Sequence, residues 1–208
     1  MNQQTVTFRQ GIPREHLTRA AALYDQAFGG KFQAVVPDRS RRIEVLKRGL
    51  DMSHGVAALS GDQLVGLAGY HTPSGSLTGG ITWRVLIEVL GPVQGSLAAM
   101  VLALFIRHSS PRELLMDGIA VEPEMRGQGV GTGLLDAVAN VASEMGLEAV
   151  RLDVIDTNPR AKQLYMRNGF AVVCTRRFEV LRWLLGFGAA DTMIRRTDVQ
   201  GHGGRGKA

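Results

Sequence analysis

Apolar and polar positions recur at recognisable spacings along most of the chain, and the clearest pattern lies between residues 116 and 170. An apolar run that ends at Val121 predicts a strand, and a polar turn then leads into the glycine-rich segment 126–132. Apolar residues next recur every three or four positions, which predicts a helix with one buried stripe made of Leu134, Leu135, Val138, Val141, Ala142 and Met145. Gly146 follows as the predicted C-terminal cap.

The same region continues with a second strand and a second helix. Residues 150–155 alternate between apolar and other side chains, which predicts a strand parallel to the one that ends at Val121. Asn158 and Pro159 are typical of the N-cap and first turn of a helix, and Gly169 is typical of its end. The inward face of this helix is expected to carry Ala161, Leu164, Tyr165 and Asn168.

Weaker patterns predict the flanking elements. Before residue 72 these are a strand, two helices and a hairpin, at residues 6–8, 13–28, 38–50, and 56–59 with 64–70. The first helix is expected to end at Gly29 and Gly30, and the second to be capped by Asp38 or Ser40. After residue 170 the pattern predicts two more strands, at 171–174 and 191–194.

Between these parts lies the segment 72–112, which predicts two helices at 82–90 and 94–107, broken at Gly91 and Pro92. The run 85–106 is apolar, but Glu88 and Pro92 interrupt it, and its longer uncharged half is too short to cross a hydrocarbon core of about 30 Å. No membrane span is therefore predicted. The segment is instead expected to be a lid over a binding site, a surface for a homodimer, or additional core.

The glycine-rich segment Arg126-Gly127-Gln128-Gly129-Val130-Gly131-Thr132 opens the first predicted helix. Its glycines leave backbone N–H groups uncovered, and a helix N-terminus adds unpaired N–H groups and partial positive charge, so the segment is suited to hold a phosphate or pyrophosphate. A Walker A loop is excluded because no Lys follows the glycines, and both possible registers of a dinucleotide fingerprint fail.

Residues 126–131 match the Arg/Gln-x-x-Gly-x-Gly/Ala signature of the GNAT superfamily of N-acetyltransferases, and residues 158–170 resemble the second conserved helix of that family. The resemblance implies an α/β fold with a mixed central sheet of about six to seven strands flanked by helices. It makes the segment 72–112 a helical insertion before the fourth strand. It also implies acetyl-CoA as cosubstrate, without a metal.

The resemblance further assigns roles to single residues. The loop from Arg126 to Thr132 would hold the pyrophosphate, and the backbone of Ile119, Ala120 and Val121 would pair with the pantetheine arm and polarise the thioester carbonyl. Asn158 would contact coenzyme A, although its N-cap position alone could explain it. Tyr165 would be the general acid that protonates the leaving thiolate, with a core tyrosine as the alternative.

Composition restricts the remaining possibilities. With 208 residues, of which 45% are hydrophobic and 21% charged, the chain is expected to form one domain over residues 1–200, followed by a disordered glycine-rich tail at 201–208. The net charge of +5 is scattered and aromatic residues make up 6%, which favours attraction of coenzyme A over nucleic-acid binding. The single cysteine, Cys174, is expected to be buried, and with the absence of a signal pattern it predicts a cytoplasmic protein.

Acetyl transfer to an amine also needs a group that removes a proton, because an alkylamine has a pKa of about 10.4. Glu113 and Asp117 are candidates because they lie four residues apart on one predicted strand and hence on the same face. Asp153, on the neighbouring predicted strand, is the third. Each matches a position at which some family members carry a base. Each could instead pair with an arginine.

The acceptor is not specified by any motif. Tyr24, Phe28 and Phe32 on or after the first helix could contact it, and so could Trp83 and Glu88 if the insertion buries them, although each could be an ordinary core or surface residue. The predicted function is transfer of acetyl to a primary amine of a small molecule. The alternatives are acetylation of a protein N-terminus or lysine, and a non-catalytic acyl-CoA-binding or interaction module that uses residues 85–106 and 178–187.

Overall fold

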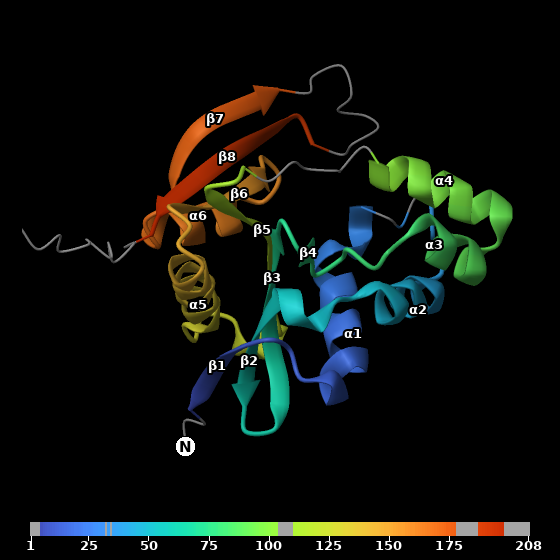
Figure 1. Ribbon diagram of the computed structural model, residues 1–208, viewed down its shortest axis with the longest axis horizontal. Coiled ribbons are helices and arrows are strands. Elements are labelled where there is room, and N and C mark those ends of the chain that lie inside the picture. Colours follow the sequence, from blue (N-terminus) through green and yellow to red (C-terminus); the bar gives the residue numbers. More distant parts are fainter. Residues whose placement is uncertain (1–4, 32, 34, 104–109, 178–186, 198–208) are drawn as a thin grey trace, which may run out of the picture.

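The computed structural model describes residues 5–31, 33, 35–103, 110–177 and 187–197. Figure 1 shows one twisted sheet with helices on both faces. The strands are β1 Val6–Gln10, β2 Gly55–Ser60, β3 Gln63–Thr72, β4 Gly75–Ser76, β5 Glu113–Val121, β6 Ala149–Ile155, β7 Ala171–Arg177 and β8 Ala189–Arg196. The α-helices are α1 Leu17–Phe28, α2 Arg39–Gly49, α3 Trp83–Leu90, α4 Pro92–Ala103, α5 Val130–Glu144 and α6 Pro159–Arg167.

The sheet is mixed, as predicted. Its order is β1-β2-β3-β5-β6-β8-β7, and the two-residue strand β4 pairs with β3 at the side of this path. All neighbours are antiparallel except β5 and β6, which are parallel. The predicted parallel pair is therefore confirmed. The additional strand, β4, lies within the segment 72–112, where the sequence showed no alternation.

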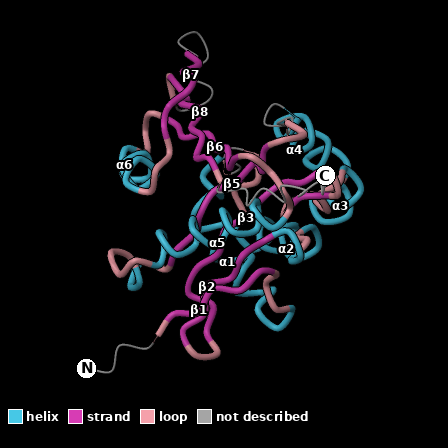
Figure 2. Tube along the Cα trace, turned by 60° about the vertical axis from the view of Figure 1, so that its left-hand side comes forward, coloured by secondary structure: helices cyan, strands magenta, loops and turns pink. Residues whose placement is uncertain are grey.

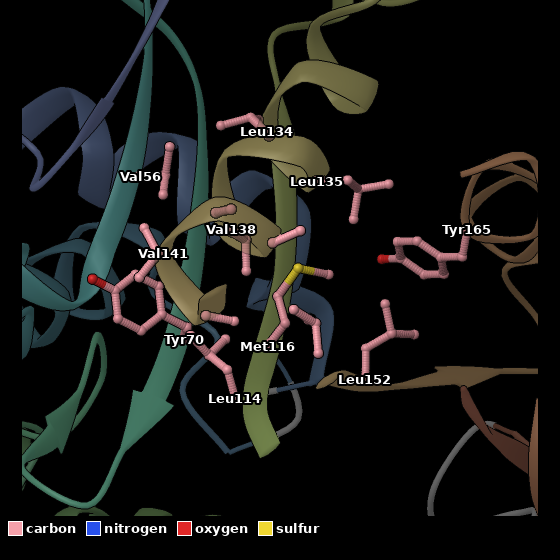
Figure 3. Close-up of a cluster of buried hydrophobic side chains, with 14 of the residues drawn as sticks. Val56, Tyr70, Leu114, Met116, Leu134, Leu135, Val138, Val141, Leu152 and Tyr165 are labelled. Atoms are coloured by element: carbon pink, nitrogen blue, oxygen red, sulfur yellow. The ribbon is translucent and has the colours of Figure 1, made fainter. Parts of the chain in front are cut away.

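The helices α5 and α6 cover one face of the sheet. Apolar residues of α5, including Leu134, Leu135 and Val138, pack against Leu114 and Met116 of β5 in the largest buried cluster (Figure 3). Met145 is the exception to the predicted stripe: it is 45% exposed because it stands at the C-cap, beyond the last turn of α5. Gly146, with φ 70°, ends the helix as predicted.

The helices α1 to α4 lie on the other side of the sheet. Leu23 of α1 packs with Leu67 of β3 and Ala120 of β5 in a second buried cluster. Figure 2 shows α3 and α4 next to α2, on the side of the molecule away from α6. Buried residues of α2, α3 and α4 form a third cluster, of which Val45, Leu86 and Ala98 are members.

The insertion is helical, with the predicted break. Thr82 caps α3 by accepting a hydrogen bond from the Val85 N–H at 3.4 Å, and Gly91 turns the chain with φ 84° before Pro92 begins α4. The two helices cross closely, since a Cβ on Gly95 would lie 2.8 Å from the backbone of Ile87. Among the described helices, none is long and apolar enough to cross a membrane.

The structure confirms the predicted cap of α2 and contradicts the predicted burial of Cys174. The predicted cap of α2 is Asp38, which accepts hydrogen bonds from the N–H groups of Ser40 and Arg41. Cys174 is exposed rather than buried, because it lies on β7, the last strand of the sheet, whose residues are all exposed. The end of the predicted helix 94–107, most of the run 178–187 and the tail 201–208 lie outside the described residues.

Candidate active site

The strands β5 and β6 separate soon after they begin. They pair only from Glu113 to Leu115, opposite Ala149 to Arg151, whereas β5 stays paired with β3 as far as Val121. No strand of the described chain therefore pairs with β5 on its β6 side from Met116 to Val121. We call this stretch of backbone the open edge. It includes Ile119, Ala120 and Val121, and an extended ligand could add to it as a strand does.

A β-bulge lies in the middle of the open edge. Gly118 is opposite Gly69 and Met116 is opposite Tyr70, so Asp117 has no partner residue in β3. A bulge bends its strand and redirects a side chain. Asp117 is thereby placed beside β3, within 3.4 Å of where a Cβ on Gly69 would stand. Gly118 has φ 146° and approaches the ring of Phe28 on α1.

The glycine-rich loop connects the open edge to α5. Gly127 and Gly129 have φ of 77° and 82°, and Gly129 is the N-cap of α5 without a side-chain capping bond. The first backbone bond of the helix runs from the Gly133 N–H to the Gly129 carbonyl at 3.0 Å. The N–H groups of the preceding residues, Val130 to Thr132, thus lack intrahelical acceptors. Among the described residues, apart from each glycine and its two chain neighbours, no atom lies within 4 Å of a Cβ built on Gly127 or Gly129, so the loop has free space in front of it.

These observations fit a pyrophosphate, which needs N–H donors, a helix N-terminus and room for its oxygens. The side chains of Arg126 and Gln128 support the loop itself: Arg126 Nε donates to the Val121 carbonyl at 3.1 Å and Gln128 Nε2 to the Glu124 carbonyl at 2.7 Å. In this conformation both residues hold the backbone in shape.

Tyr165 projects from α6 into the main buried cluster. It is 7% exposed, its ring lies 5.9 Å from that of Phe170, and its hydroxyl points toward β5 (Figure 3). The two helices meet tightly here, because a Cβ on Gly131 would be 3.1 Å from Leu164. Asn158 caps α6, as its oxygen accepts a hydrogen bond from the Ala161 N–H at 3.2 Å. Tyr165 and the glycine-rich loop are therefore held in a fixed relation.

The three candidate carboxylates have different partners. Glu113 pairs with Arg151 at 3.5 Å. Asp153 accepts a hydrogen bond from Thr192 at 2.6 Å and pairs with Arg176 at 3.4 Å. Asp117 is bonded instead to the His71 imidazole, through its Nε2. Its second oxygen, Oδ2, is buried and has no hydrogen-bond partner among the described residues.

His71 is a candidate site residue that the sequence did not indicate. It lies at the end of β3, 46 residues before Asp117, and its side chain is 25% exposed. The antiparallel register of β3 and β5 brings it next to the bulge. The apolar run 64–70 predicted a strand as the second half of a hairpin, but only knowledge of the register with β5 would have paired His71 with Asp117.

The predicted acceptor contacts divide into two groups. Tyr24 and Phe28 lie together on α1 with ring centroids 4.7 Å apart, and Phe28 covers Gly118 next to Asp117. The apolar environment expected for Trp83 and Glu88 is not found, because α3 turns Leu86 and Leu90 inward. Trp83 is 62% exposed, and Glu88 forms surface ion pairs with Arg84 and Arg48. Phe32 lies outside the described residues.

Comparison with known proteins agrees with this geometry. The family model described as acetyltransferase (GNAT) family matches residues 21–170, more than half of the chain. The chain belongs to the GNAT acetyltransferase family. The mixed sheet with its flanking helices is the GNAT fold.

Proteins named as acetyltransferases match this chain over short segments. A bovine (Bos taurus) thialysine N-epsilon-acetyltransferase is 43% identical over 58 residues, which are 28% of this chain and 34% of that protein. A mycothiol acetyltransferase of Propionibacterium freudenreichii subsp. shermanii is 44% identical over 57 residues, 27% of this chain and 18% of that one. The chain thus spans about a third or less of the length of these two relatives.

Two solved structures resemble this chain over nearly its whole length. The ribosomal-protein-S18-alanine N-acetyltransferase of Escherichia coli has a TM-score of 0.53 at 17% identity, covering 96% of this chain and 98% of its own. Ard1 of Thermoplasma volcanium has a TM-score of 0.54 at 17% identity, covering 92% and 97%. At such identities the likeness shows the fold alone.

Proposed function

We propose that this enzyme transfers an acetyl group from acetyl-CoA to a primary amine of a small-molecule acceptor, and that His71, oriented by Asp117, takes the proton of the amine. The observation that carries the proposal is the hydrogen-bonded His71–Asp117 pair at the bulge of β5, directly beside the open edge. Asp117 is thus the candidate carboxylate for which an imidazole partner is found in the described part of the chain.

Acetyl-CoA, when bound, supplies a thioester carbonyl as the electrophile. The residues that would hold it are the N–H groups at the start of α5, the glycines 127, 129 and 131, and the backbone of Ile119 to Val121. N–H groups of the open edge, which have no strand partner in the described chain, would donate to the carbonyl oxygen and stabilise the negative charge that develops there. The side-chain oxygen of Asn158 caps α6, so its side-chain NH₂ group would make the contact with coenzyme A.

His71 would perform the proton transfer from the acceptor. Its Nε2–H donates to Asp117, so its Nδ1 carries the lone pair that can accept a proton. An alkylamine is almost fully protonated at neutral pH, since its pKa is about 10.4, and its neutral form is the nucleophile. A carboxylate behind the imidazole holds the ring in one tautomer and stabilises the cation that forms.

Tyr165 would return a proton at the other side of the reacting bond. A phenol stays protonated near neutral pH and can donate to a leaving thiolate. Its hydroxyl points from α6 toward β5, the strand that carries the open edge (Figure 3). Glu113 and Asp153 are less suited to act as the base, because each is engaged by an arginine.

The test is release of coenzyme A thiol from acetyl-CoA with a panel of acceptors. The panel contains alkylamines, arylalkylamines, polyamines, amino acids, and peptides with free or blocked N-termini. We expect turnover with small primary amines. Turnover with peptides alone would replace the small-molecule proposal by protein acetylation. Calorimetric binding of acetyl-CoA without turnover of any acceptor would contradict the proposed transfer and favour a binding module.

A further inference from the structure

The insertion encloses space next to the acceptor side of the site. We propose that an apolar cavity between α1, α2, α3 and α4 receives an uncharged, apolar tail of the amine acceptor. The proposal rests on the function proposed above and adds the chemical class of the substrate: a primary amine joined by a short chain to an alkyl or aryl group.

The cavity is formed by side chains from four helices. It encloses about 450 Å³ of space between atoms, including the part open to solvent, and its walls include Val45, Leu46, Leu86, Leu90, Ala98 and Leu102. Because these walls are apolar, burial of apolar surface is the main source of affinity that this cavity offers.

The charged residues in the cavity wall neutralise each other. Asp25 and Arg42 are joined at 2.7 Å, with side chains that are 3% and 12% exposed, and Arg39 also reaches Asp25 at 3.3 Å. Arg42 further donates to the carbonyls of Val36 and Pro37, at 2.8 and 2.9 Å. A second ammonium group in the cavity would lose its water without gaining a free carboxylate from the described wall. The tail should therefore be uncharged.

Two aromatic rings connect the cavity to the proposed base. Tyr24 lines the cavity and lies 4.7 Å from Phe28, one turn further along α1. Phe28 covers Gly118, which adjoins Asp117, the partner of His71. One helical turn advances about 5.4 Å, so a chain of only a few methylene groups is needed to reach the cavity from the His71–Asp117 pair. An amine at His71 could thus extend its tail along Phe28 and Tyr24.

The experiment compares two series of acceptors. For n-alkylamines from propylamine to octylamine, kcat/KM should rise about fourfold per methylene until the cavity is filled. The α,ω-diaminoalkanes of equal length should be at least about tenfold poorer at each length, because their second ammonium must be desolvated. Equal turnover of both series, or turnover independent of length, would overturn the cavity as the tail site and leave the acetyltransferase function intact.

Variants locate the effect in the cavity. Ala98 is 3% exposed, and Ala98→Phe should fill the space and flatten the dependence on chain length. Val93 is on the same helix but 84% exposed, so Val93→Phe is the matched control and should keep the wild-type slope. A folded Ala98→Phe protein that keeps the slope would overturn the proposal. Should Ala98→Phe fail to fold, Leu90→Ala should enlarge the cavity and shift the best substrate to longer chains, and an unshifted optimum would overturn it instead.

Calorimetry separates this proposal from the proposed function. Octylamine is titrated into the enzyme with coenzyme A present, without any need for turnover. Binding that strengthens with chain length and is lost in Ala98→Phe, in the absence of turnover of any amine, would support the cavity and contradict acetyl transfer to amines. Absence of both binding and turnover would overturn both.

Discussion

The two faces of the sheet are built differently. On the α5 and α6 face, one continuous buried cluster joins both helices to the strands, and it contains Tyr165 and Val130, the residue that follows the exposed Gly129. On the other face, the buried residues fall into two clusters, one under α1 and one among α2, α3 and α4, with an apolar cavity and a buried ion pair beside them. In the function proposed above, the first face supports the cosubstrate and the second receives the acceptor.

This difference between the two faces predicts that the largest loss of turnover comes from substitutions on the face proposed to bind the acceptor. His71→Ala should lower kcat by roughly a thousandfold, because it removes the group proposed to accept the proton of the amine. Asp117→Asn should act in the same direction by disturbing the orientation of His71. Steady-state release of coenzyme A thiol measures both.

Two controls accompany these variants. Glu113→Gln removes a carboxylate on the same strand that pairs with Arg151, and it should stay within about tenfold of wild type. His54→Ala removes another histidine next to an aspartate, Asp51, and should keep turnover. Wild-type kcat in folded His71→Ala, or a larger loss in Glu113→Gln, would transfer the role of base to a different residue.

Breaking the buried ion pair between Asp25 and Arg42 should give the second largest effect, on stability rather than on turnover. Asp25→Asn leaves the guanidinium of Arg42 buried without its charge partner, and such a loss costs about 3 kcal/mol in the free energy of unfolding. This corresponds to a fall of roughly 10 °C in the melting temperature. Calorimetric melting provides the measurement. Glu44→Gln breaks an exposed pair with Arg48 within α2, the helix that also carries Arg42, and should leave the melting temperature nearly unchanged. Equal shifts in the two variants would mean that burial of the Asp25–Arg42 pair has no influence on stability.

The same difference between the faces explains what could be predicted from the sequence. The loop, the helix after it, the caps Asn158 and Gly146, and the parallel strands follow from residues close together in the chain, and the structure contains all of them. His71 was missed because its partner is 46 residues away and strand register is not encoded locally. Trp83 and Glu88 were possible acceptor contacts only if the insertion buried them, and the sequence did not specify how the insertion packs; α3 turns Leu86 and Leu90 inward instead.

A substitution of Tyr165 tests the function proposed for the α5 and α6 face. Tyr165→Phe keeps the ring that packs against Phe170 but removes the proposed proton donor, so kcat should fall by about a hundredfold while the affinity for coenzyme A stays unchanged. Tyr70→Phe is the matched control from the same cluster: it removes the hydrogen bond to the Ser53 carbonyl, which should cost about 1 kcal/mol of stability, and should leave kcat intact. Full activity of Tyr165→Phe across the pH range would remove Tyr165 from the mechanism.

The glycine-rich loop should show a smaller effect, on binding. Gly129→Val and Gly146→Val place a side chain at φ of 82° and 70° at opposite ends of α5, with no atom within 4 Å of either Cβ. Both should therefore lose about 1–2 kcal/mol of stability. Only Gly129→Val should also weaken binding of coenzyme A, by about tenfold, because it alone obstructs the N–H groups at the helix start. Equal calorimetric affinities for coenzyme A in the two variants would contradict a role of the loop in binding the pyrophosphate.

The smallest effect concerns the ion pair that ties α6 to β8. The Lys162 ammonium, hydrogen-bonded to Asp191 at 2.6 Å, holds the pKa of this carboxyl below its usual range, and the hydroxyl of Thr175 contributes in the same direction. The Lys162 side chain is 40% exposed, so screening by water limits the contribution of the pair to under about 1 kcal/mol.

The direction of the pKa shift of Asp191 determines the pH range in which the ion pair stabilises the fold. Because folding lowers the pKa of Asp191, the stabilisation is fully present above the unfolded value of about 3.9 and disappears as the pH falls through the lower, folded value. The difference in free energy of unfolding between wild type and Asp191→Asn should therefore be constant near neutral pH and shrink below about pH 4. Lys162→Gln should remove most of the same dependence, since its ammonium is the main cause. A difference that stays constant from neutral to acidic pH in chemical denaturation would show that Asp191 and Lys162 are held together by packing alone, unlike the buried pair on the opposite face.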